Sequence, residues 1–434
     1  MINIEANQDK NKRILTSIIL ICIAVTVGLN NIVIGYKVAG ISIDRIMQIF
    51  IFIFIFKHFT KDLKDKNLKF VEIIILWFLI LIIFNNFSLL IQNEDKITLM
   101  TFTRDTIRVF MYGIFTYLVY YLLKNDMKKL NIILLIQFSA VLLAFFQNPM
   151  TPLTDWSQQL KMNYFLVNMM QADQEWYNAF MDDTNYNFMR VSGPYGQVVT
   201  MSYTLVVSAI LTTYMYLSTN KKIYIYFLLF LFLVSVMSLT RSAVGGIFIM
   251  LLFIAGKEKV YFIGLLALGI IYMLFFGDFD YSNLDNYTRV ISTDDTSARG
   301  KVPIWITGIA TIIMYPFGIT DMDYMSVKEL MYSIYKNEDI LRYPSHNGII
   351  NLGFQYTILG VFLFVYFIYR LCKMSNILTK KERKFWLFAF FAYLFQQSFH
   401  NNGIFYVEFN VLIILALYLV EINSKKIRGM EIQI

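Results

Sequence analysis

Long apolar runs separated by short charged connectors constrain this chain more than any other feature. Roughly twelve runs approach the length of about 20 residues that a helix needs to cross the hydrocarbon core of a bilayer. They lie at about 14–35, 39–56, 70–91, 105–123, 130–147, 196–217, 223–238, 240–255, 260–276, 347–369, 385–400 and 404–421. A lipid-exposed strand would leave its backbone hydrogen bonds unpaired, so each run is predicted to be a helix. We therefore expect an all-α integral membrane protein with about 12 transmembrane helices.

The composition excludes most classes of soluble protein. Of the 434 residues, 57% are hydrophobic and 16% are charged, whereas soluble domains average about 45–50% and 25%. The formal net charge of +8 does not indicate a nucleic-acid partner, because the charges are confined to the connectors. The two cysteines, Cys22 and Cys372, lie in unrelated segments and do not predict a disulfide.

The basic residues predict which side of the membrane each connector occupies. With a cytoplasmic N-terminus, the cytoplasmic segments are both tails and the connectors near 57–69, 124–129, 221–222, 257–259 and 370–384. They hold 24 of the 38 lysines and arginines, which agrees with the positive-inside rule. Both termini are thus predicted to be cytoplasmic.

Two connectors, about 147–195 and 277–345, are much longer than the rest and are predicted to face outward. Long ordered connectors usually carry function. In the second, the apolar pattern of Lys301–Tyr315 predicts an amphipathic helix lying at the membrane interface. No fixed-period repeat or Pro/Gly-rich linker is visible, so the chain is predicted to be a single polytopic membrane domain over 1–434 with two external loops.

Arginine is concentrated on the predicted outer side. The cytoplasmic set contains 20 Lys and 4 Arg, whereas the outer set contains 6 Lys and 8 Arg. A topology signal needs only charge, but a phosphate site favours the planar guanidinium, which binds oxyanions bidentately and stays protonated. Both long loops are net acidic. Arginines retained there indicate specific contacts rather than a general basic surface.

The first candidate site is Thr240-Arg241-Ser242, which is followed by Gly245-Gly246. It opens a predicted helix at the outer membrane edge, where an arginine is costly unless it snorkels or faces a polar cavity. One interpretation is a phosphate ligand at a helix N-terminus, where the dipole and free N–H groups favour an anion. The alternative is a snorkelling interfacial arginine.

Three more arginines and a histidine are candidates. Arg289 and Arg299 precede the predicted interfacial helix and are placed to grip a diphosphate, although pairing with neighbouring aspartates is the alternative. Arg190, before a Gly-Pro turn, is a secondary candidate. His346 lies at the outer edge of the segment beginning near 347, where it can take a proton from an attacking hydroxyl or merely cap a helix.

Metal chemistry is not predicted. Two Asp-x-Asp pairs, at 278–280 and 321–323, have the spacing that holds a divalent cation in some sugar transferases, but such pairs are common in acidic loops. Neither a zinc-ligand cluster nor an ATPase-type phosphate loop is visible. We expect no metal and no cofactor.

The order of these features resembles the O-antigen polymerase and ligase superfamily, integral-membrane enzymes of bacterial surface polysaccharide assembly. The resemblance covers roughly 190–360. It rests on an arginine motif that opens a helix and on a large outer loop leading to a histidine, with these residues: Arg241, Arg299, Trp305, Pro316, Gly318, His346, Asn347, Gly353 and Gly360.

The resemblance implies a multi-spanning (GT-C-like) glycosyltransferase that polymerises lipid-linked repeat units of O-antigen, capsule or exopolysaccharide on the outer face of the bacterial cytoplasmic membrane. Arg241 and Arg299 would bind the undecaprenyl diphosphate of the donor, with Arg289 and Arg190 secondary, and His346 would be the general base or position the substrate. The reaction would be inverting and metal-independent. The implied partners are lipid-linked oligosaccharide donor and acceptor, the lipid bilayer and a chain-length regulator, and not nucleic acid.

Two other functions stay open. An O-antigen ligase would transfer the finished chain to a different acceptor. A flippase or other transporter would carry charged residues along mid-membrane helices and would have helices broken near the midplane. The charged residues here gather mainly at the outer helix ends, with Asp44, Arg45 and Glu408 as exceptions, so the polymerase is the expected function.

Overall fold

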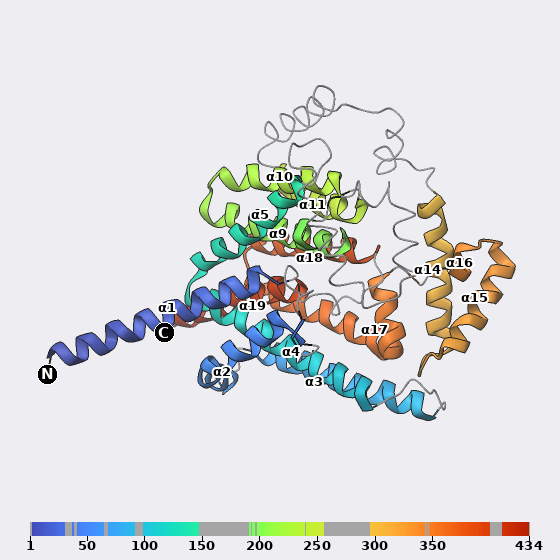
Figure 1. The fold of residues 1–434 in the computed structure, drawn as a ribbon, viewed down its shortest axis with the longest axis horizontal. Coiled ribbons are helices and arrows are strands. Elements are labelled where there is room, and N and C mark those ends of the chain that lie inside the picture. Colours follow the sequence, from blue (N-terminus) through green and yellow to red (C-terminus); the bar gives the residue numbers. More distant parts are fainter. Residues whose placement is uncertain are drawn as a thin grey trace, which may run out of the picture.

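The structure of the protein is a computed structural model (Figure 1), which describes residues 2–30, 37–38, 41–64, 68–91, 99–146, 191, 193–195, 198–238, 240–255, 296–342, 345, 347–399 and 410–433. Apart from one short hairpin, the described elements are helices. They are α1 (Ile2–Gly28), α2 (Ile43–Lys64), α3 (Lys69–Ile91), α4 (Leu99–Asn125), η1 (Met127–Lys129), α5 (Leu130–Phe146), η2 (Gly193–Tyr195), α9 (Val198–Thr219), α10 (Ile223–Met237), α11 (Arg241–Ala255), α14 (Thr296–Met314), α15 (Asp321–Tyr335), α16 (Asp339–Arg342), α17 (Gly348–Met374), η4 (Ser375–Ile377), α18 (Lys380–Gln397) and α19 (Asn410–Gln433). The hairpin pairs β1 (Lys37–Val38) with β2 (Ile41–Ser42) in antiparallel register.

The predicted apolar segments overlap helices throughout the described chain. The segment 260–276 lies outside the described residues. The predicted segments 14–35 and 39–56 differ from the structure around the β1–β2 hairpin. Helix α1 ends at Gly28 rather than near residue 35, and α2 begins at Ile43 rather than near residue 39. The alternating run Ile51–Phe56 is helical, with Ile51 and Ile55 buried and Phe54 and Phe56 exposed, as expected for a lipid-facing helix.

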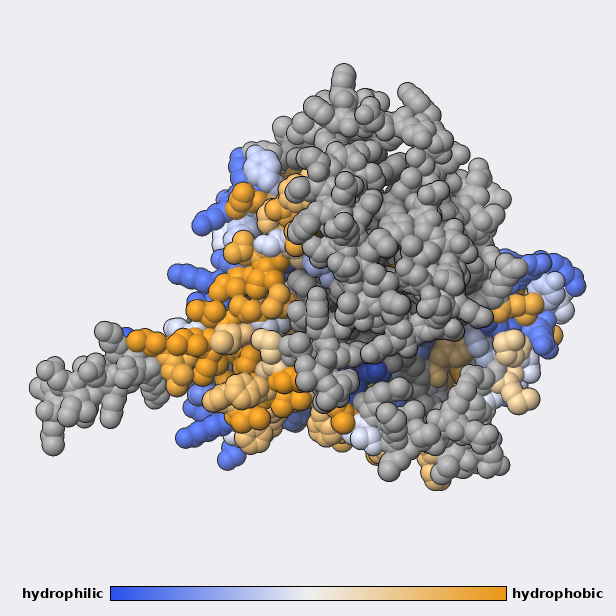
Figure 2. Space-filling view, viewed as in Figure 1, coloured by the Kyte–Doolittle hydropathy of each residue, from blue (hydrophilic) through white to orange (hydrophobic). Residues whose placement is uncertain are grey.

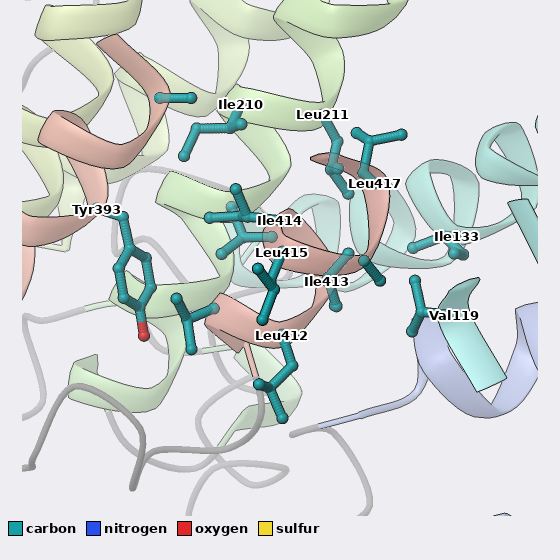
Figure 3. Close-up of a cluster of buried hydrophobic side chains, with 14 of the residues drawn as sticks. Val119, Ile133, Ile210, Leu211, Tyr393, Leu412, Ile413, Ile414, Leu415 and Leu417 are labelled. Atoms are coloured by element: carbon teal, nitrogen blue, oxygen red, sulfur yellow. The ribbon is translucent and has the colours of Figure 1, made fainter. Parts of the chain in front are cut away.

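The centre of the bundle is formed by α9, which packs against α5, α10, α11, α18 and α19. Its side chains are buried along nearly the whole helix. Figure 3 shows part of this core, in which Ile210 and Leu211 of α9 approach Ile413, Ile414 and Leu417 of α19. Because α9 is buried on all sides, its sequence has no charged face of the kind that a surface helix shows.

Polar contacts join neighbouring helices at the end of the bundle near the last turns of α19. The buried carboxylate of Asp62 on α2 forms an ion pair with Lys124 of α4 and accepts a hydrogen bond from the Tyr117 hydroxyl at 3.1 Å. On α19, Asn423 donates to the Tyr120 hydroxyl at 3.2 Å. A buried charge is costly unless it is paired, so this network fixes α2 and α4 in register at that end.

Four described helices are long and apolar enough to cross a membrane: Asp105–Asn125, Met127–Phe146, Val199–Thr219 and Tyr356–Ile377. The bent pair Arg45–Lys64 and Lys69–Phe84 is a fifth candidate if counted as one span. Figure 2 shows an apolar surface that continues from α1 onto the adjoining helices of the bundle. The described chain is therefore an all-helical membrane protein apart from its small hairpin.

The outer segment 277–345 is built as a small helical unit over its described part, 296–342. Helices α14, α15 and α16 pack around their own apolar core of Ile304, Val327, Met331 and Ile340. The predicted interfacial helix is confirmed as a helix by α14, but α14 begins five residues earlier than Lys301. The unit lies on the opposite side of the bundle from the first turns of α1 and the last turns of α19 (Figure 1).

Helix α17 is broken, which the sequence did not predict. Tyr356 and Thr357 have non-helical backbone angles, and Thr357 has φ 61° and ψ −169°. The amide of Ile358 donates to the carbonyl of Pro316, between α14 and α15, at 3.3 Å. The predicted span 347–369 is therefore two helices, of which only the one from Tyr356 to Ile377 is long enough to cross.

Candidate functional site

Of the five candidate site residues, the structure describes the side chain of one. Arg241 is the first residue of α11 and is half-buried. Arg299 lies within the first turns of α14, which corrects the prediction that it precedes the helix. His346, Arg289 and Arg190 lie outside the described residues, although Ser345 and Asn347 on either side of His346 are described.

The start of α11 is fixed by Thr240 and by two glycines. The carbonyl of Thr240 accepts the amides of Ala243 and Val244 at 3.0 and 3.1 Å, so Thr240 begins the helix. A Cβ on Gly245 would lie 2.2 Å from Cε1 of Phe395 on α18. A Cβ on Gly246 would lie 3.1 Å from the carbonyl oxygen of Ala392. The glycines therefore let α11 approach α18 closely, as small residues do between membrane helices.

Helices α10 and α11 are each shorter than a full membrane crossing. Each helix has 15 residues, or about 22 Å of rise, against a hydrocarbon core of about 30 Å. With Lys221 and Lys222 at the cytoplasmic surface, as the sequence predicts, the turn between the two helices stops short of the outer edge. Thr240 and Ser242, on either side of Arg241, are buried polar residues.

Beside this turn, the outer end of α18 carries a buried amide network. Gln396 and Gln397 are fully buried. The Nε2 of Gln396 donates to Ser202 Oγ on α9 at 3.1 Å, and the Nε2 of Gln397 donates to the Tyr393 hydroxyl at 3.1 Å. Because α11 and α18 pack antiparallel through Gly245 and Phe395, Arg241 and Gln397 lie at the same end of the helix pair.

The outer unit contacts the same end of the bundle. The ring of Trp305 on α14 lies 5.8 Å, centroid to centroid, from Phe399, which follows α18. Phe399 in turn lies 5.2 Å from Phe395, the residue that packs on Gly245. A continuous row of aromatic side chains therefore connects the helix that contains Arg299 with the helix that begins at Arg241.

The residues flanking His346 are tied to this region as well. The Oδ1 of Asn347 accepts from the amides of Ile349 and Ile350 at 2.9 and 3.2 Å and so caps α17. Its Nδ2 donates to the carbonyl of Ser398, one residue after α18, at 3.2 Å. Asn347 therefore caps the helix, which was the alternative role considered for His346. It also ties the backbone next to the histidine to the end of α18.

The outer half of α17 packs against α14 through glycines. A Cβ on Gly308 of α14 would lie 2.6 Å from Cγ2 of Ile350, and a Cβ on Gly353 would lie 2.3 Å from Cδ1 of Ile312. The hydroxyl of Ser345 also donates to Asn351. The unit α14–α16 and the first half of α17 therefore form one packed body at the outer end of the bundle.

One of the two Asp-x-Asp pairs has a structural role. The carboxylate of Asp323 accepts from the amide and hydroxyl of Thr320 at 3.0 and 2.7 Å, in a capping box that begins α15. The pair at 278–280 lies outside the described residues. Within the described ranges, no group of three or more His, Cys, Asp or Glu side chains could hold a metal.

Comparisons of the chain with family models, curated proteins and solved structures find no match.

Sequence reasoning missed Gln396 and Gln397, and it included Asn347 in the resemblance without identifying it as the cap of α17. The two glutamines interrupt an apolar run only briefly, so the segment 385–400 keeps the hydropathy of a membrane helix. Two consecutive amides at the outer end of a predicted span are nevertheless a signal, because a polar group there needs a partner. Their partner Ser202 lies 194 residues away and cannot be identified from the sequence alone.

Proposed function

We propose that the protein polymerises lipid-linked oligosaccharide repeat units at the outer face of a bacterial cytoplasmic membrane. The observation that carries the proposal is the convergence of three sequence-distant elements on the outer end of α18. These are the start of α11 with Arg241, the helix α14 with Arg299, and the capping residue Asn347 next to His346. They are the elements that the family resemblance associates with donor binding and catalysis.

The proposed chemistry is an inverting glycosyl transfer. An acceptor hydroxyl attacks the anomeric carbon of the donor sugar, and the bond from that carbon to the diphosphate oxygen breaks, with its electron pair leaving on the diphosphate. His346 takes the hydroxyl proton as general base. Arg241 and Arg299 stabilise the negative charge that develops on the leaving group, with Arg289 and Arg190 as secondary ligands.

The proposal includes a finer description of the membrane arrangement. About twelve crossings in a GT-C-like fold would place both termini in the cytoplasm and the loops 147–195 and 277–345 outside. The position of the α14–α16 unit opposite the ends of α1 and α19 supports this orientation (Figure 1). The partners proposed are undecaprenyl-diphosphate-linked donor and acceptor, the bilayer and a chain-length regulator.

The test is polymerisation by the purified protein in detergent or liposomes. Undecaprenyl-diphosphate-linked repeat units should yield products longer than one unit without added nucleotide. Arg241→Ala and His346→Ala should each reduce the rate by at least about 100-fold, the scale of losing a charge-stabilising group or a general base. Arg108→Ala is the matched control, because Arg108 is an outer-side arginine paired with Asp105 at 3.4 Å. Normal ladders from both site variants would refute the catalytic assignment.

The ligase alternative differs only in the acceptor. The same preparation can be given a lipid-linked chain together with either a second lipid-linked unit or a lipid A-core acceptor. Transfer to the second unit supports the polymerase, and transfer only to the core acceptor supports the ligase.

The break in α17 is the observation that favours a transporter, since broken helices bind substrates in many transporters. In those proteins, however, the break lies near the midplane. Here the part of the chain after the break, Tyr356–Ile377, has 22 residues and spans about 33 Å, so the break lies at one end of the crossing. Movement of an intact lipid-linked unit across liposomes without chain growth would support the transporter instead.

A further inference from the structure

The hydrogen bonds around Gln396 and Gln397 leave one atom without a partner. The Oε1 of Gln397 is buried and accepts no hydrogen bond from any residue that the structure describes. The side chain itself is fully buried. An unsatisfied buried carbonyl costs about 1–3 kcal/mol, so it needs an explanation.

A chain of donors and acceptors fixes the orientation of this carbonyl. The hydroxyl of Ser202 donates to the backbone carbonyl of Val199 at 2.6 Å, so its oxygen must accept from the next group. Gln396 therefore presents its Nε2 to Ser202 and its Oε1 to Gln397. That oxygen requires a donor, so Gln397 presents its Nε2 to Gln396, at 3.4 Å, and to the Tyr393 hydroxyl.

The unpaired Oε1 of Gln397 therefore cannot be explained by interchanging the nitrogen and oxygen of the amide. Turning the Gln397 amide over would place its carbonyl oxygen against that of Gln396. Turning both amides over would place the Gln396 carbonyl oxygen against the Ser202 hydroxyl, whose proton already donates to Val199. The network therefore ends at the Oε1 of Gln397. Its orientation is set, through Gln396 and Ser202, by the backbone carbonyl of Val199 on α9.

This acceptor lies between the two halves of the proposed site. Arg241 is at the same end of the α11–α18 pair, one helical turn before Gly245. On the other side, Ser398 directly follows Gln397, and its carbonyl binds Asn347, the neighbour of His346. A ligand held by Arg241 and extending toward Asn347 would pass the end of α18.

We propose that Gln397 binds the sugar of the lipid-linked substrate, with its Oε1 accepting a hydrogen bond from a hydroxyl or acetamido N–H group of the ring that carries the diphosphate. This inference rests on the proposed function and assigns a sugar-recognising residue to that site. A site built to accept a hydrogen bond discriminates strongly against a ligand that lacks the donor, because the buried acceptor is then left unpaired.

The test compares two probes that differ only in the sugar. Binding of undecaprenyl diphosphate and of undecaprenyl-diphosphate N-acetylglucosamine to the full-length protein is measured for the wild type, Gln397→Leu and Gln397→Asn. The Asn variant retains the amide but withdraws it by one methylene, so it keeps the test valid if the Leu variant does not fold. Gln137→Leu is the matched control, because Gln137 is a buried membrane amide that accepts from Ser208 on α9 at 2.7 Å.

The wild type is expected to prefer the sugar-bearing lipid. Both Gln397 variants should weaken binding of that lipid by about 3- to 10-fold, the value of one neutral hydrogen bond, and leave binding of undecaprenyl diphosphate within twofold. Gln137→Leu should preserve the preference. An unchanged preference in the Gln397 variants, or an equal loss of binding for both lipids, would overturn this inference but not the proposed function. Failure of the wild type to bind either lipid would overturn the proposed function and this assignment with it.

Discussion

At the scale of single residues, the close contact between α11 and α18 depends on Gly245 and Gly246, which meet different kinds of atom. Gly245 faces the ring of Phe395, a side chain that can be exchanged. Gly246 faces the side chain of Val206 on α9 and also the backbone carbonyl of Ala392, which cannot be trimmed by mutation. Tightly packed interiors resist added methyl groups, and the two positions should respond differently to a compensating change.

We expect Gly245→Ala and Gly246→Ala each to destabilise the protein by about 1–3 kcal/mol through overpacking. Adding Phe395→Leu should restore most of the stability lost in Gly245→Ala, because it removes the ring that the new Cβ would strike. The same second change should not rescue Gly246→Ala. Thermal unfolding in detergent measures all four variants. Equal rescue of both glycine variants would contradict the contact described for Gly246.

The residues of the candidate site differ in how visible they are in the sequence. Arg241 is conspicuous because an arginine beside a long apolar run is costly and therefore rare. Gln397 is inconspicuous because its burial and its unpaired oxygen arise from helices that are distant in the chain. Asn347 could be identified as a helix cap from its position before Gly348, but its bond to Ser398 could not.

At the scale of helices, the start of α18 is tied to the last turns of α19. Lys425 of α19 donates to Glu382 of α18 at 2.7 Å, and Glu382 also caps the start of α18 by accepting from the amide of Thr379 at 2.9 Å. Burial alone would raise the pKa of Glu382. The hydrogen bonds from Lys425 and Thr379 outweigh burial and lower the pKa below its ordinary value of 4.5.

A lowered pKa means that the folded protein holds Glu382 charged more strongly than the unfolded chain does. This stabilisation is present above about pH 4.5 and is lost as the pH falls through the folded-state pKa. Glu382→Gln should therefore be less stable than the wild type at pH 7, by under about 1 kcal/mol for such a partly exposed pair, and should lose less stability toward pH 4. Unfolding midpoints at both pH values provide the measurement. Glu329→Gln, which removes an exposed carboxylate on α15, is the control.

The positions of the helices follow from local sequence, whereas the break in α17 does not. Long apolar runs fix where helices form, because every backbone group inside a membrane must be paired within its own segment. At the break, the amide of Ile358 pairs instead with the carbonyl of Pro316, 42 positions earlier in the chain. The surrounding sequence, Phe354 to Gly360, contains no proline that would announce a break.

At the scale of the whole molecule, polar and apolar features separate along one axis. Glu382 and the Asp62 network lie beside the last turns of α19, which contact Glu382 and Tyr120. The amide network lies at the other end of α18 from Glu382. The α14–α16 unit lies on the opposite side of the bundle from the last turns of α19 (Figure 1). The surface of the α14–α16 unit mixes hydrophilic and hydrophobic side chains (Figure 2), which suits a membrane–water interface. If the lysine-rich end is cytoplasmic, this unit must face outward.

Site-directed labelling tests that orientation. With Cys22 and Cys372, both free and exposed, replaced by serine, single cysteines are introduced at Met322 on α15, which is 80% exposed, and at the exposed Lys221 between α9 and α10. In right-side-out vesicles, a membrane-impermeant maleimide should label Met322→Cys at once and Lys221→Cys only after permeabilisation.

The inverse pattern would place the end of α18 on the cytoplasmic side, where Arg241 and Gln397 could not meet an externally displayed lipid-linked sugar. Labelling of both sites before permeabilisation would mean that α9 does not cross the membrane, although its length and hydropathy suffice. Orientation is therefore the premise that the sugar-binding and catalytic assignments share, and it can be tested independently of either activity.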